Sequence, residues 1–279
     1  MINVDDLLED VARALKEDLG TGDVSAQLIA ANQQVTAQII AREPLLMCGQ
    51  AWANAVFTVV SPAIEINWFV QEGEWLEEPT TLCQIAGPAR AILTAERSVL
   101  NFLQTLSGTA TRTYHYLQAM GTSDVRLLDT RKTLPGLRKA QKYAVVCAGG
   151  MNHRIGLYDA FLIKENHIKA CGSIKSAISK ARSLQYGILV EVEVENLYEY
   201  QQARAAKPDR ILLDNFSESM LREAVDLNVP KVCELEASGG VTLFNIAAIA
   251  TTGIDYISVG DLTKSVQAID LSLLIQDEE

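Results

Sequence analysis

The spacing of apolar residues predicts an N-terminal region that combines one helix with short strands. Residues 4–16 carry apolar side chains three and four positions apart, which is the pattern of an amphipathic helix. Shorter runs typical of strands follow at residues 35–41, 64–70 and 81–85. One helix followed by several strands is typical of a small α+β domain.

Helical spacing returns over residues 91–120, where Gly108 is the only strong helix breaker. This segment predicts one long helix or two stacked helices that cross a domain boundary, which we place near Ser107. The expected domains are therefore residues 1–107 and residues 108–279. The sequence leaves open whether the C-terminal segment packs back on the first domain.

The second region alternates regularly between buried strands and helices. Six apolar runs predict its strands: residues 125–128, 161–163, 188–194, 210–213, 232–235 and 256–259. Asn196 with Glu199 predicts a capping box at the start of one helix, and Ser217 predicts the N-cap of the next. Strands that alternate with helices are expected to be parallel, in an open doubly wound sheet or a closed β/α barrel.

Two features favour the barrel. Between residues 190 and 195 glutamate alternates with valine, so the acidic side chains share one face of the strand, and residues 234–238 show a similar split. A sheet covered by helices on both faces is apolar on both faces, whereas a barrel interior near its open end accepts acidic side chains. Polar residues also end or follow the strands, at the rim where β/α barrels carry their active sites. They are Asp129, Lys164, Glu195, Asp214, Ser238 and Gly260.

Composition indicates the class of protein and its compartment. The chain has 279 residues, 48% hydrophobic and 21% charged, as in globular proteins, and no apolar run approaches the roughly 18 to 20 residues of a membrane span. Its five cysteines are widely spread without a C-x-x-C pair, so neither a disulfide framework nor a zinc site is predicted. Together with an acidic N-terminus unlike a secretory signal, these features predict a cytoplasmic protein that does not bind a membrane.

Charge is distributed unevenly along the chain. The net charge of −11 argues against nucleic-acid binding, because phosphate backbones are held by basic surfaces. Residues 126–169 nevertheless contain nine Lys or Arg residues, only three Asp or Glu, and both His153 and His167. Arginine forks match carboxylate and phosphate groups, and lysine adds a compact charge, so the segment predicts a site for a small polyanionic substrate. A solvated charged surface and a structural ion-pair network are the plainer alternatives.

Glycine turns and strand-end carboxylates add candidate phosphate and metal ligands. The turns lie at residues 149–150, residues 238–240 and Gly260, and backbone N–H groups at such turns and at helix N-termini bind phosphate. Glu193 and Asp214, at neighbouring strand ends, are suited to ribose hydroxyls or to Mg²⁺, which prefers oxygen ligands. Neither a Walker-A loop nor a G-x-G-x-x-G fingerprint is present.

Three motifs identify a family resemblance. They read LDTRKTLPGLR at residues 128–138, GGMNHR at residues 149–154 and FLIKENH at residues 161–167. This set closely resembles the quinolinate phosphoribosyltransferase family, also called nicotinate-nucleotide pyrophosphorylases. Further matches extend the resemblance over essentially the whole chain, at residues 17–18, 22–23, 96–97, 101–103, 191–196, 213–215, 236–239 and 257–260.

The resemblance implies a fold, an assembly and a reaction. The implied fold is an N-terminal α/β sandwich domain followed by an incomplete β/α barrel, which is open and has six or seven strands. The implied assembly is a homodimer in which each subunit completes the other's site. The reaction would convert quinolinate and phosphoribosyl pyrophosphate (PRPP) to nicotinate mononucleotide, pyrophosphate and CO₂, with Mg²⁺, in NAD biosynthesis.

The resemblance also implies which residues bind quinolinate. Arg131, Arg154 and Lys164 would hold its two carboxylates, and Arg97 of the partner subunit would reach into the same pocket. Two further residues would line the pocket, Lys132 and His153.

Other roles implied by the resemblance concern the sugar, the phosphate and the metal. Glu193 and Asp214 would face the ribose and Mg²⁺, with contact to the metal either direct or through water or PRPP. Ser238, Gly239 and Gly260 would bind phosphate. The residues expected to act in catalysis are Lys132, Lys164, Glu193 and Asp214.

Asp261 departs from the family pattern, which has a small residue such as alanine after Gly260. A carboxylate at this position weakens phosphate binding unless it points away or pairs with Lys264. Its orientation therefore decides whether the phosphate site is intact.

Three other functions are alternatives. The chain could be a related phosphoribosyltransferase for another anion, a silent homologue that senses pyridine carboxylates, or a Schiff-base aldolase that uses Lys164. Arg131 and Arg154 together argue against the first alternative. Glu193, Asp214 and Lys164 argue against the second, and the motifs around Lys164 argue against the third.

Overall fold

The computed structural model describes residues 3–185 and 187–276, and these residues form two compact units. The first unit consists of residues 3–114, 134–149 and 265–276, and the second of residues 115–133 and 150–264. The chain thus returns to the first unit twice, once in the middle of the sequence and once at its C-terminal end.

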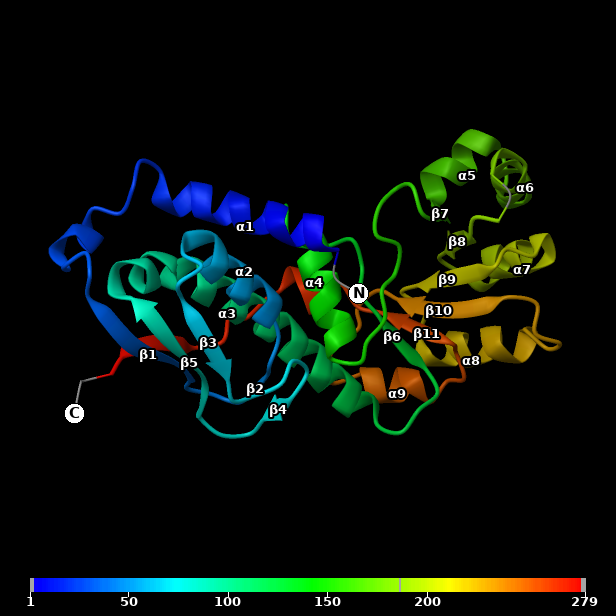
Figure 1. Cartoon of the computed structure of the whole chain (residues 1–279). Coiled ribbons are helices and arrows are strands. Elements are labelled where there is room, and N and C mark those ends of the chain that lie inside the picture. Colours follow the sequence, from blue (N-terminus) through cyan, green and yellow to red (C-terminus); the bar gives the residue numbers. More distant parts are fainter. Residues whose placement is uncertain (1–2, 186, 277–279) are drawn as a thin grey trace. The chain divides into compact units, whose positions relative to one another are not determined.

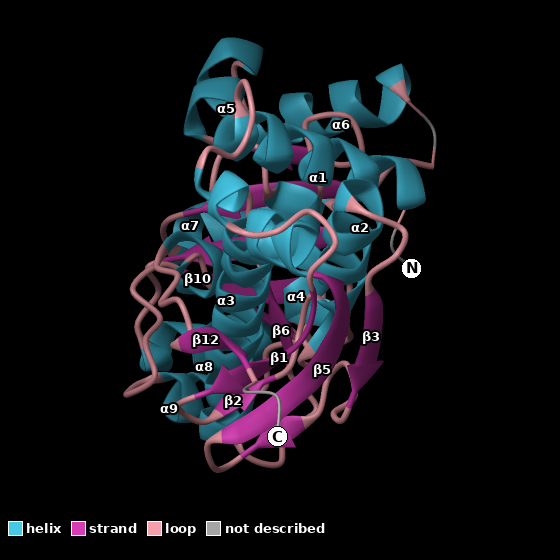
Figure 2. Ribbon diagram, turned by 60° about the vertical axis from the view of Figure 1, so that its left-hand side comes forward, coloured by secondary structure: helices cyan, strands magenta, loops and turns pink. Residues whose placement is uncertain are grey.

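The first unit contains a four-stranded antiparallel sheet with strand order β12-β1-β5-β3 (Figure 2). Its strands are β1 (Gln34–Ala41), β3 (Glu65–Trp68), β5 (Thr80–Pro88) and β12 (Leu271–Ile275). The C-terminal strand β12 pairs with β1, with Ile39 opposite Leu273. The C-terminal segment is therefore part of the N-terminal sheet.

Helices of the first unit bury their apolar sides in one core with this sheet (Figure 1). The helical elements are α1 (Val4–Leu19), the 3₁₀ helix η1 (Ser25–Leu28), α2 (Gln50–Val60), the first part of α3 (Ala89–Met120) and α4 (Arg138–Cys147). A two-stranded ribbon, β2 (Leu45–Leu46) with β4 (Trp75–Leu76), completes the unit. Leu7, Val11 and Leu15 are buried on α1, as the helical spacing of the sequence predicts.

Of the two predictions for residues 91–120, the single long helix is correct, because α3 is continuous. Gly108 does not break it, because a helix tolerates one glycine at a cost of about 1 kcal/mol. Its role is steric: a Cβ atom at this position would lie 2.1 Å from the carbonyl oxygen of Gln267. Glycine thus allows the returning C-terminal segment to pass close to the helix.

The second unit contains a six-stranded parallel sheet with strand order β6-β11-β10-β9-β8-β7. Its strands are β6 (Arg126–Leu128), β7 (Phe161–Ile163), β8 (Val190–Val194), β9 (Arg210–Asp214), β10 (Glu234–Ser238) and β11 (Tyr256–Ser258). From β7 to β11 consecutive strands are neighbours, and the last strand, β11, pairs with the first, β6. A doubly wound sheet reverses its strand order at a switch point, whereas this cyclic order is that of a β/α barrel open between β6 and β7. The predicted fold class is confirmed.

Helices follow the strands of the second unit, and Asn196 and Ser217 both act as N-caps, although the predicted capping box of Asn196 with Glu199 does not form. The helices are α5 (Glu165–Cys171), α6 (Ile174–Leu184), α7 (Leu197–Ala206), α8 (Glu218–Leu227), α9 (Ile246–Ala250) and α10 (Asp261–Lys264). The Asn196 side chain accepts a hydrogen bond from the backbone N of Glu199, and Ser217 accepts one from Met220. The Glu199 carboxylate differs from a capping box, because it accepts from the backbone N of Glu195 rather than from the N-cap residue.

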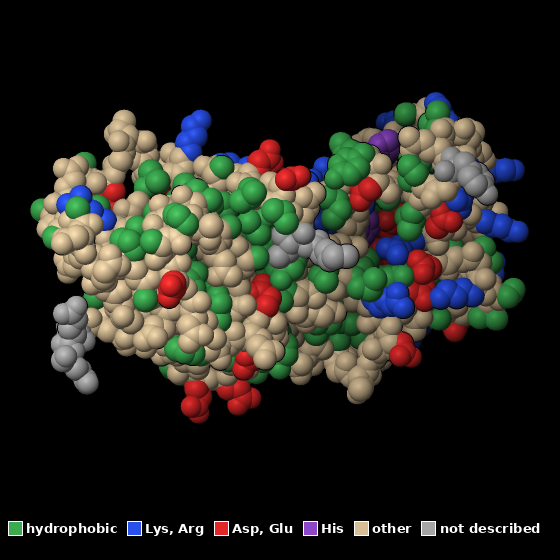
Figure 3. Space-filling model, viewed as in Figure 1, with side chains coloured by type: hydrophobic (Ala, Val, Ile, Leu, Met, Phe, Trp, Pro, Cys, Tyr) green, Lys and Arg blue, Asp and Glu red, His purple; other side chains and the backbone are tan. Residues whose placement is uncertain are grey.

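The surface carries mixed rather than uniformly basic charge. On the face shown in Figure 3, Lys and Arg side chains over the second unit lie among Asp and Glu side chains. The ion pair between Arg182 and Asp209, 2.8 Å long, is one example. In the described part of the chain, no helix has the length and apolar character needed to cross a bilayer.

Candidate active site

A cavity of about 340 Å³ lies at the carboxyl ends of the parallel strands in the second unit. All six strands or the segments that follow them contribute side chains, as expected for the reaction end of a β/α barrel. The lining residues are Thr130, Arg131, Lys132, His153, Arg154, Leu162, Lys164, Glu193, Leu212, Glu236, Ser238 and Ser258. Seven of them belong to the predicted substrate site: Arg131, Lys132, His153, Arg154, Lys164, Glu193 and Ser238.

The other predicted site residues do not line this cavity. Asp214 ends β9, and Gly239 and Gly260 follow β10 and β11, so the three lie at the same edge of the sheet. A Cβ on Gly260 would lie 3.0 Å from Cδ of Lys132, which places the lysine stem directly over this glycine. Arg97 is exposed on α3 in the first unit and is not among the residues that form the cavity.

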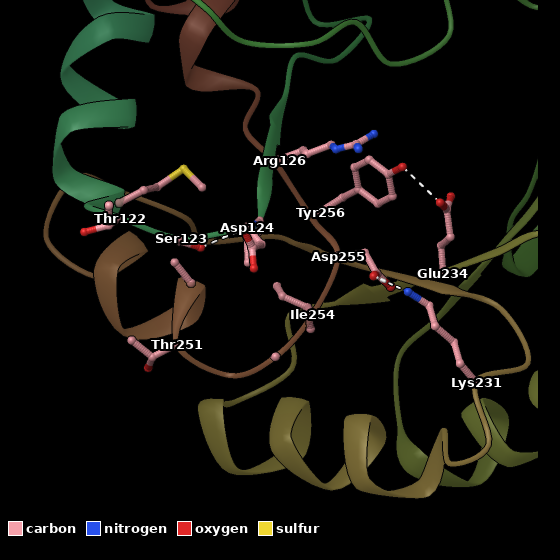
Figure 4. Close-up of a pocket in the computed structure, with 14 residues that line it drawn as sticks. Thr122, Ser123, Asp124, Arg126, Lys231, Glu234, Thr251, Ile254, Asp255 and Tyr256 are labelled. Atoms are coloured by element: carbon pink, nitrogen blue, oxygen red, sulfur yellow. Dashed lines mark hydrogen bonds and ion pairs between the residues drawn. The ribbon is translucent and has the colours of Figure 1, made fainter.

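A larger cavity, of about 630 Å³, lies at the opposite ends of the strands (Figure 4). Arg126, Glu234 and Tyr256, which line it, are the first residues of β6, β10 and β11. Several of its polar groups pair with one another: the Tyr256 hydroxyl donates to Glu234 over 3.0 Å, and Lys231 forms an ion pair with Asp255. This end of a β/α barrel contributes to stability rather than to reaction, so the smaller cavity is the candidate site.

Backbone contacts fix the two loops that carry the basic residues. After β6, the backbone N of Asp129 donates to the carbonyl of Met151 over 3.1 Å, and the Asp129 carboxylate accepts from the backbone N of His153 over 2.9 Å. The carbonyl of Lys132 accepts from the Thr263 hydroxyl over 2.7 Å. The segment with Arg131 and Lys132 is therefore held next to the segment with His153 and Arg154.

The electrostatics of the cavity favour an anionic ligand. Burial lowers the pKa of Arg154, and the positive charge of Arg131 lowers it further, so two guanidinium groups act on one small volume. Lys164 forms an ion pair with Glu193 on the neighbouring strand end. A ligand with two carboxylates relieves the repulsion between the guanidinium groups and provides partners for their forks.

His167 has a structural role instead of a place in the cavity. Its Nδ1 atom accepts a hydrogen bond of 3.0 Å from the backbone N of Lys164, and this contact caps the start of α5. His167 thus helps to fix the backbone of Lys164. The position of this histidine in a basic segment of the sequence does not reveal that role.

The barrel interior holds charged residues that the sequence prediction did not include in the site, and one of them, Glu236, also lines the cavity. Glu191 and Glu236 are both 0% exposed. Arg210 donates to Glu236 over 3.0 Å and to Glu234 over 3.1 Å, and its guanidinium lies 3.8 Å from the centre of the Tyr256 ring. Burial raises the pKa of Glu191 to about 7 and that of Glu236 to about 8. The alternation of glutamate with valine is the signal that points to this interior face.

The raised pKa of Glu236 predicts a pH-dependent stability. The unfolded chain releases this proton near the ordinary value of 4.5, but the folded protein keeps it up to a pH of about 8. The free energy of unfolding should therefore fall as pH rises between these values, by up to about 1.4 kcal/mol per pH unit. Glu236→Gln removes this slope, so the melting temperature of the variant relative to that of the unsubstituted protein should rise with pH. Parallel melting curves for the two proteins from pH 5 to about pH 8 would contradict the prediction, and Glu195→Gln, at an exposed site, is the control.

A tight turn after β10 depends on Gly239. Its φ angle is +85°, and a Cβ would lie 2.3 Å from Oδ1 and 2.9 Å from the backbone N of Asn215. That backbone N donates to the carbonyl of Ser238 over 2.8 Å. Asn215 itself has a positive φ of 56° and donates from its side chain to Asp214. The turn therefore connects Ser238 and Gly239, the predicted phosphate-binding residues at the end of β10, with Asp214 at the end of β9.

Gly239→Ala is expected to lower the free energy of unfolding by about 2 kcal/mol or more, because strain at positive φ adds to a clash. Gly240→Ala is the matched control: its φ is +62°, but no atom lies within 4 Å of the added Cβ. The control variant should lose only about 1 kcal/mol. Urea unfolding of both variants measures the difference, and equal losses would mean that the contact with Asn215 does not matter.

The carboxylate of Asp261 has a hydrogen-bond partner within the second unit. Its Oδ2 atom accepts a hydrogen bond of 2.9 Å from the hydroxyl of Tyr116. This partner is on α3, and it differs from Lys264, which the sequence offered as a pairing partner. The negative charge at this position is therefore engaged within the protein.

Family models match both parts of the chain. The model described as quinolinate phosphoribosyl transferase, C-terminal domain, matches residues 109–274, and the N-terminal domain model matches residues 23–107. The chain is 40% identical over 258 residues to the probable nicotinate-nucleotide pyrophosphorylase (carboxylating) of Bacillus subtilis strain 168, over 92% of this chain and 89% of the relative. It is also 40% identical over 272 residues to the nicotinate-nucleotide pyrophosphorylase (carboxylating) of Mycobacterium leprae, over 95% of each chain.

Solved structures agree with these matches. The nicotinate-nucleotide pyrophosphorylase from Francisella tularensis superposes with a TM-score of 0.95 at 47% identity, over 99% of this chain and 98% of that one. The enzyme of the same name from Pyrococcus furiosus is only 18% identical, with a TM-score of 0.68, and its likeness extends to the fold alone.

Proposed function

Because the chain belongs to the quinolinate phosphoribosyltransferase family, we propose that it transfers a phosphoribosyl group from PRPP to quinolinate. The products are nicotinate mononucleotide, pyrophosphate and CO₂, in the biosynthesis of NAD. The enzyme is thus a decarboxylating pentosyltransferase.

One observation carries this proposal: four cationic side chains and two carboxylates, those of Glu193 and Glu236, converge on a single small cavity. Arg131 and Lys132 follow β6, Arg154 lies in the segment before β7, Lys164 follows β7, and Glu193 lines the same cavity from β8. Quinolinate is a planar dianion, so the two arginine forks suit its two carboxylates, with Lys164 as a point charge beside them. His153 and Lys132 complete the lining.

The chemistry requires positioning and charge rather than a nucleophile. Departure of pyrophosphate leaves positive charge on the ribose carbon, and the carboxylate of Glu193 stabilises that charge. The cationic cluster holds the pyridine nitrogen in line with this carbon. After transfer, the positively charged pyridinium nitrogen accepts the electrons left by CO₂, so the decarboxylation needs no strong acid or base.

The donor set at the rim fits Mg²⁺. Oxygen ligands suit this ion, which keeps several waters or phosphate oxygens and takes only one or two protein carboxylates. Glu193 and Asp214 provide two such groups on adjacent strands, where Glu193 contacts Lys164 and Asp214 accepts from Asn215. When bound, the ion neutralises charge on the departing pyrophosphate. Ser238, Gly239 and Gly260 are placed to bind the phosphate of the sugar.

The working unit is proposed to be a homodimer. All residues that form the cavity belong to the second unit, whereas Arg97 is exposed on α3 of the first unit. Arg97 of the partner subunit would supply a further cation to the quinolinate carboxylates.

The free thiols of the chain suit a reducing compartment, which supports the cytoplasmic location expected from the sequence.

The direct test is release of pyrophosphate and CO₂ by the purified protein with quinolinate, PRPP and Mg²⁺. Both products should appear in equal amounts, and neither should form when quinolinate is replaced by nicotinate. Activity with nicotinate and none with quinolinate would overturn the assigned substrate. Borohydride trapping of a carbonyl substrate on Lys164 would instead support the aldolase alternative.

A further inference from the structure

Both ring nitrogens of His153 contact groups of the protein. Nδ1 accepts a hydrogen bond of 2.8 Å from the backbone N of Arg154. Nε2 lies 3.0 Å from Oε2 of Glu191 and 3.6 Å from Oε2 of Glu236. A backbone N–H can only donate, so Nδ1 carries the lone pair and the ring proton lies on Nε2, toward the carboxylates. The ring therefore uses its polar atoms inside the protein, although it lines the cavity.

The carboxylate nearest to Nε2 is that of Glu191, which belongs to a buried network of charged side chains. Glu191 is 0% exposed and lies opposite Arg210 in the pairing of β8 with β9. Arg210 is held in turn by Glu234, Glu236 and the Tyr256 ring. Among the described residues, no hydrogen bond satisfies either oxygen of Glu191. A buried carboxylate without hydrogen bonds is costly. The imidazole Nε2 approaches Oε2 of Glu191 to 3.0 Å without completing a hydrogen bond, so the contact is one of close electrostatic approach.

On its other side the ring contacts Arg154, which belongs with Arg131 and Lys164 to the group predicted to hold the quinolinate carboxylates, called the quinolinate clamp below. The backbone of His153 is anchored by its N–H to Asp129 over 2.9 Å. The next residue is Arg154, whose N–H is bound to the ring. The position of the imidazole therefore determines the direction in which the Arg154 backbone leaves this anchor, and with it the place of the guanidinium group.

We propose that Glu191 is a positioning residue for quinolinate binding: its buried carboxylate orients the His153 ring, and the ring orients the backbone of Arg154. This inference rests on the proposed function, because it concerns affinity for quinolinate. It adds to the place of His153 in the cavity lining a role in orienting Arg154.

A metal ion is the other occupant that these side chains could suit, because His153, Glu191 and Glu236 each offer a ligand atom within 4.8 Å of the others. Metal binding at Nε2 requires the ring proton to lie on Nδ1. That position already receives the N–H of Arg154, so the observed hydrogen bond favours positioning over metal binding.

A matched pair of variants tests the role of Glu191. Glu191→Gln keeps an oxygen at the position that faces the imidazole, whereas Glu191→Met has a similar length but no polar atom there. We expect Glu191→Met to raise the Kd for quinolinate roughly ten- to hundredfold. The KM for PRPP should change by less than about twofold in both variants, because neither change touches the phosphate site. Glu191→Gln should retain most of the quinolinate affinity, because its side chain keeps an oxygen facing the imidazole. Calorimetric titration with quinolinate and steady-state kinetics provide these values.

A double-mutant cycle separates positioning from general loss of structure. His153→Asn keeps an oxygen near the position of Nδ1 for the N–H of Arg154 but cannot reach Glu191. It should weaken quinolinate binding by itself, so the inference stays testable even if Glu191→Met does not fold. In the His153→Asn background, Glu191→Met should cause no further loss, because the two residues act in one chain of contacts.

The outcomes distinguish this inference from the proposed function. If the unsubstituted protein neither binds quinolinate nor releases pyrophosphate from PRPP, both are overturned. If it does both, the positioning role is wrong when Glu191→Met binds quinolinate normally. It is also wrong when the losses from Glu191→Met and His153→Asn simply add, or when PRPP binding falls as much as quinolinate binding.

Discussion

Arg131→Ala is expected to lower kcat/KM for quinolinate roughly a hundred- to a thousandfold. Arg131 and Arg154 both line the cavity, and the charge of Arg131 is close enough to lower the pKa of Arg154. Removing one guanidinium leaves a substrate carboxylate desolvated without its partner, at a cost of about 3 to 4 kcal/mol. Steady-state kinetics with varied quinolinate, at saturating PRPP and Mg²⁺, measures the loss.

Two further variants show whether this loss comes from the clamp. Arg131→Lys keeps the charge but not the planar fork, so its activity should lie between those of the unsubstituted protein and the alanine variant. Lys175→Ala removes one positive charge at an exposed position of α6 and should leave kcat/KM unchanged. The clamp is wrongly assigned if Arg131→Ala keeps its quinolinate affinity or if Lys175→Ala is equally impaired.

The position of the cavity was predictable because parallel strands bring their carboxyl ends to one edge. Lys164, Glu193 and Ser238 are far apart in the sequence, yet each ends or follows a strand of the same sheet, and all three line the cavity. Local apolar patterns locate such strand ends to within a few residues. The residue types at those ends then indicate the charge of the ligand.

Strand β10 shows where the apolar pattern misleads. The sequence predicted residues 232–235, but the strand is Glu234–Ser238. The backbone N of Val232 donates to the side chain of Asn228 over 3.2 Å, and the carbonyl of Cys233 accepts from the same side chain over 2.9 Å. These contacts satisfy the backbone outside the sheet, and an apolar run does not reveal them.

The interior network was beyond prediction because it depends on pairing between strands. Arg210 is the first residue of β9, and its position in the sequence gives no hint that it meets Glu234 and Glu236 of β10. The contact of His153 with Glu191 likewise joins a loop to a strand from another part of the chain. Register between strands and the path of loops are tertiary properties, and single-sequence patterns do not contain them.

Arg97→Ala and Arg131→Ala should each be nearly inactive alone yet restore activity when they form a mixed dimer. If each site takes Arg131 from one subunit and Arg97 from the other, a mixed dimer contains one complete site and one site that lacks both arginines. Mixed dimers isolated by two different affinity tags should therefore show about half the activity of the unsubstituted dimer. The expected recovery is large because, in each single-variant dimer, every site lacks one arginine that pairs with a quinolinate carboxylate.

The matched control for this complementation is the mixture of Arg131→Ala with Arg154→Ala. Both residues line the cavity within one subunit, so every site in that mixed dimer lacks one of them and activity should not return. If activity returns in the mixture of Arg97→Ala with Arg131→Ala but not in the control mixture, Arg97 acts from the partner subunit. If Arg97 instead acted within its own subunit, its mixture with Arg131→Ala would behave like the control mixture. The same result in both mixtures, recovery or no recovery, would therefore contradict the shared site.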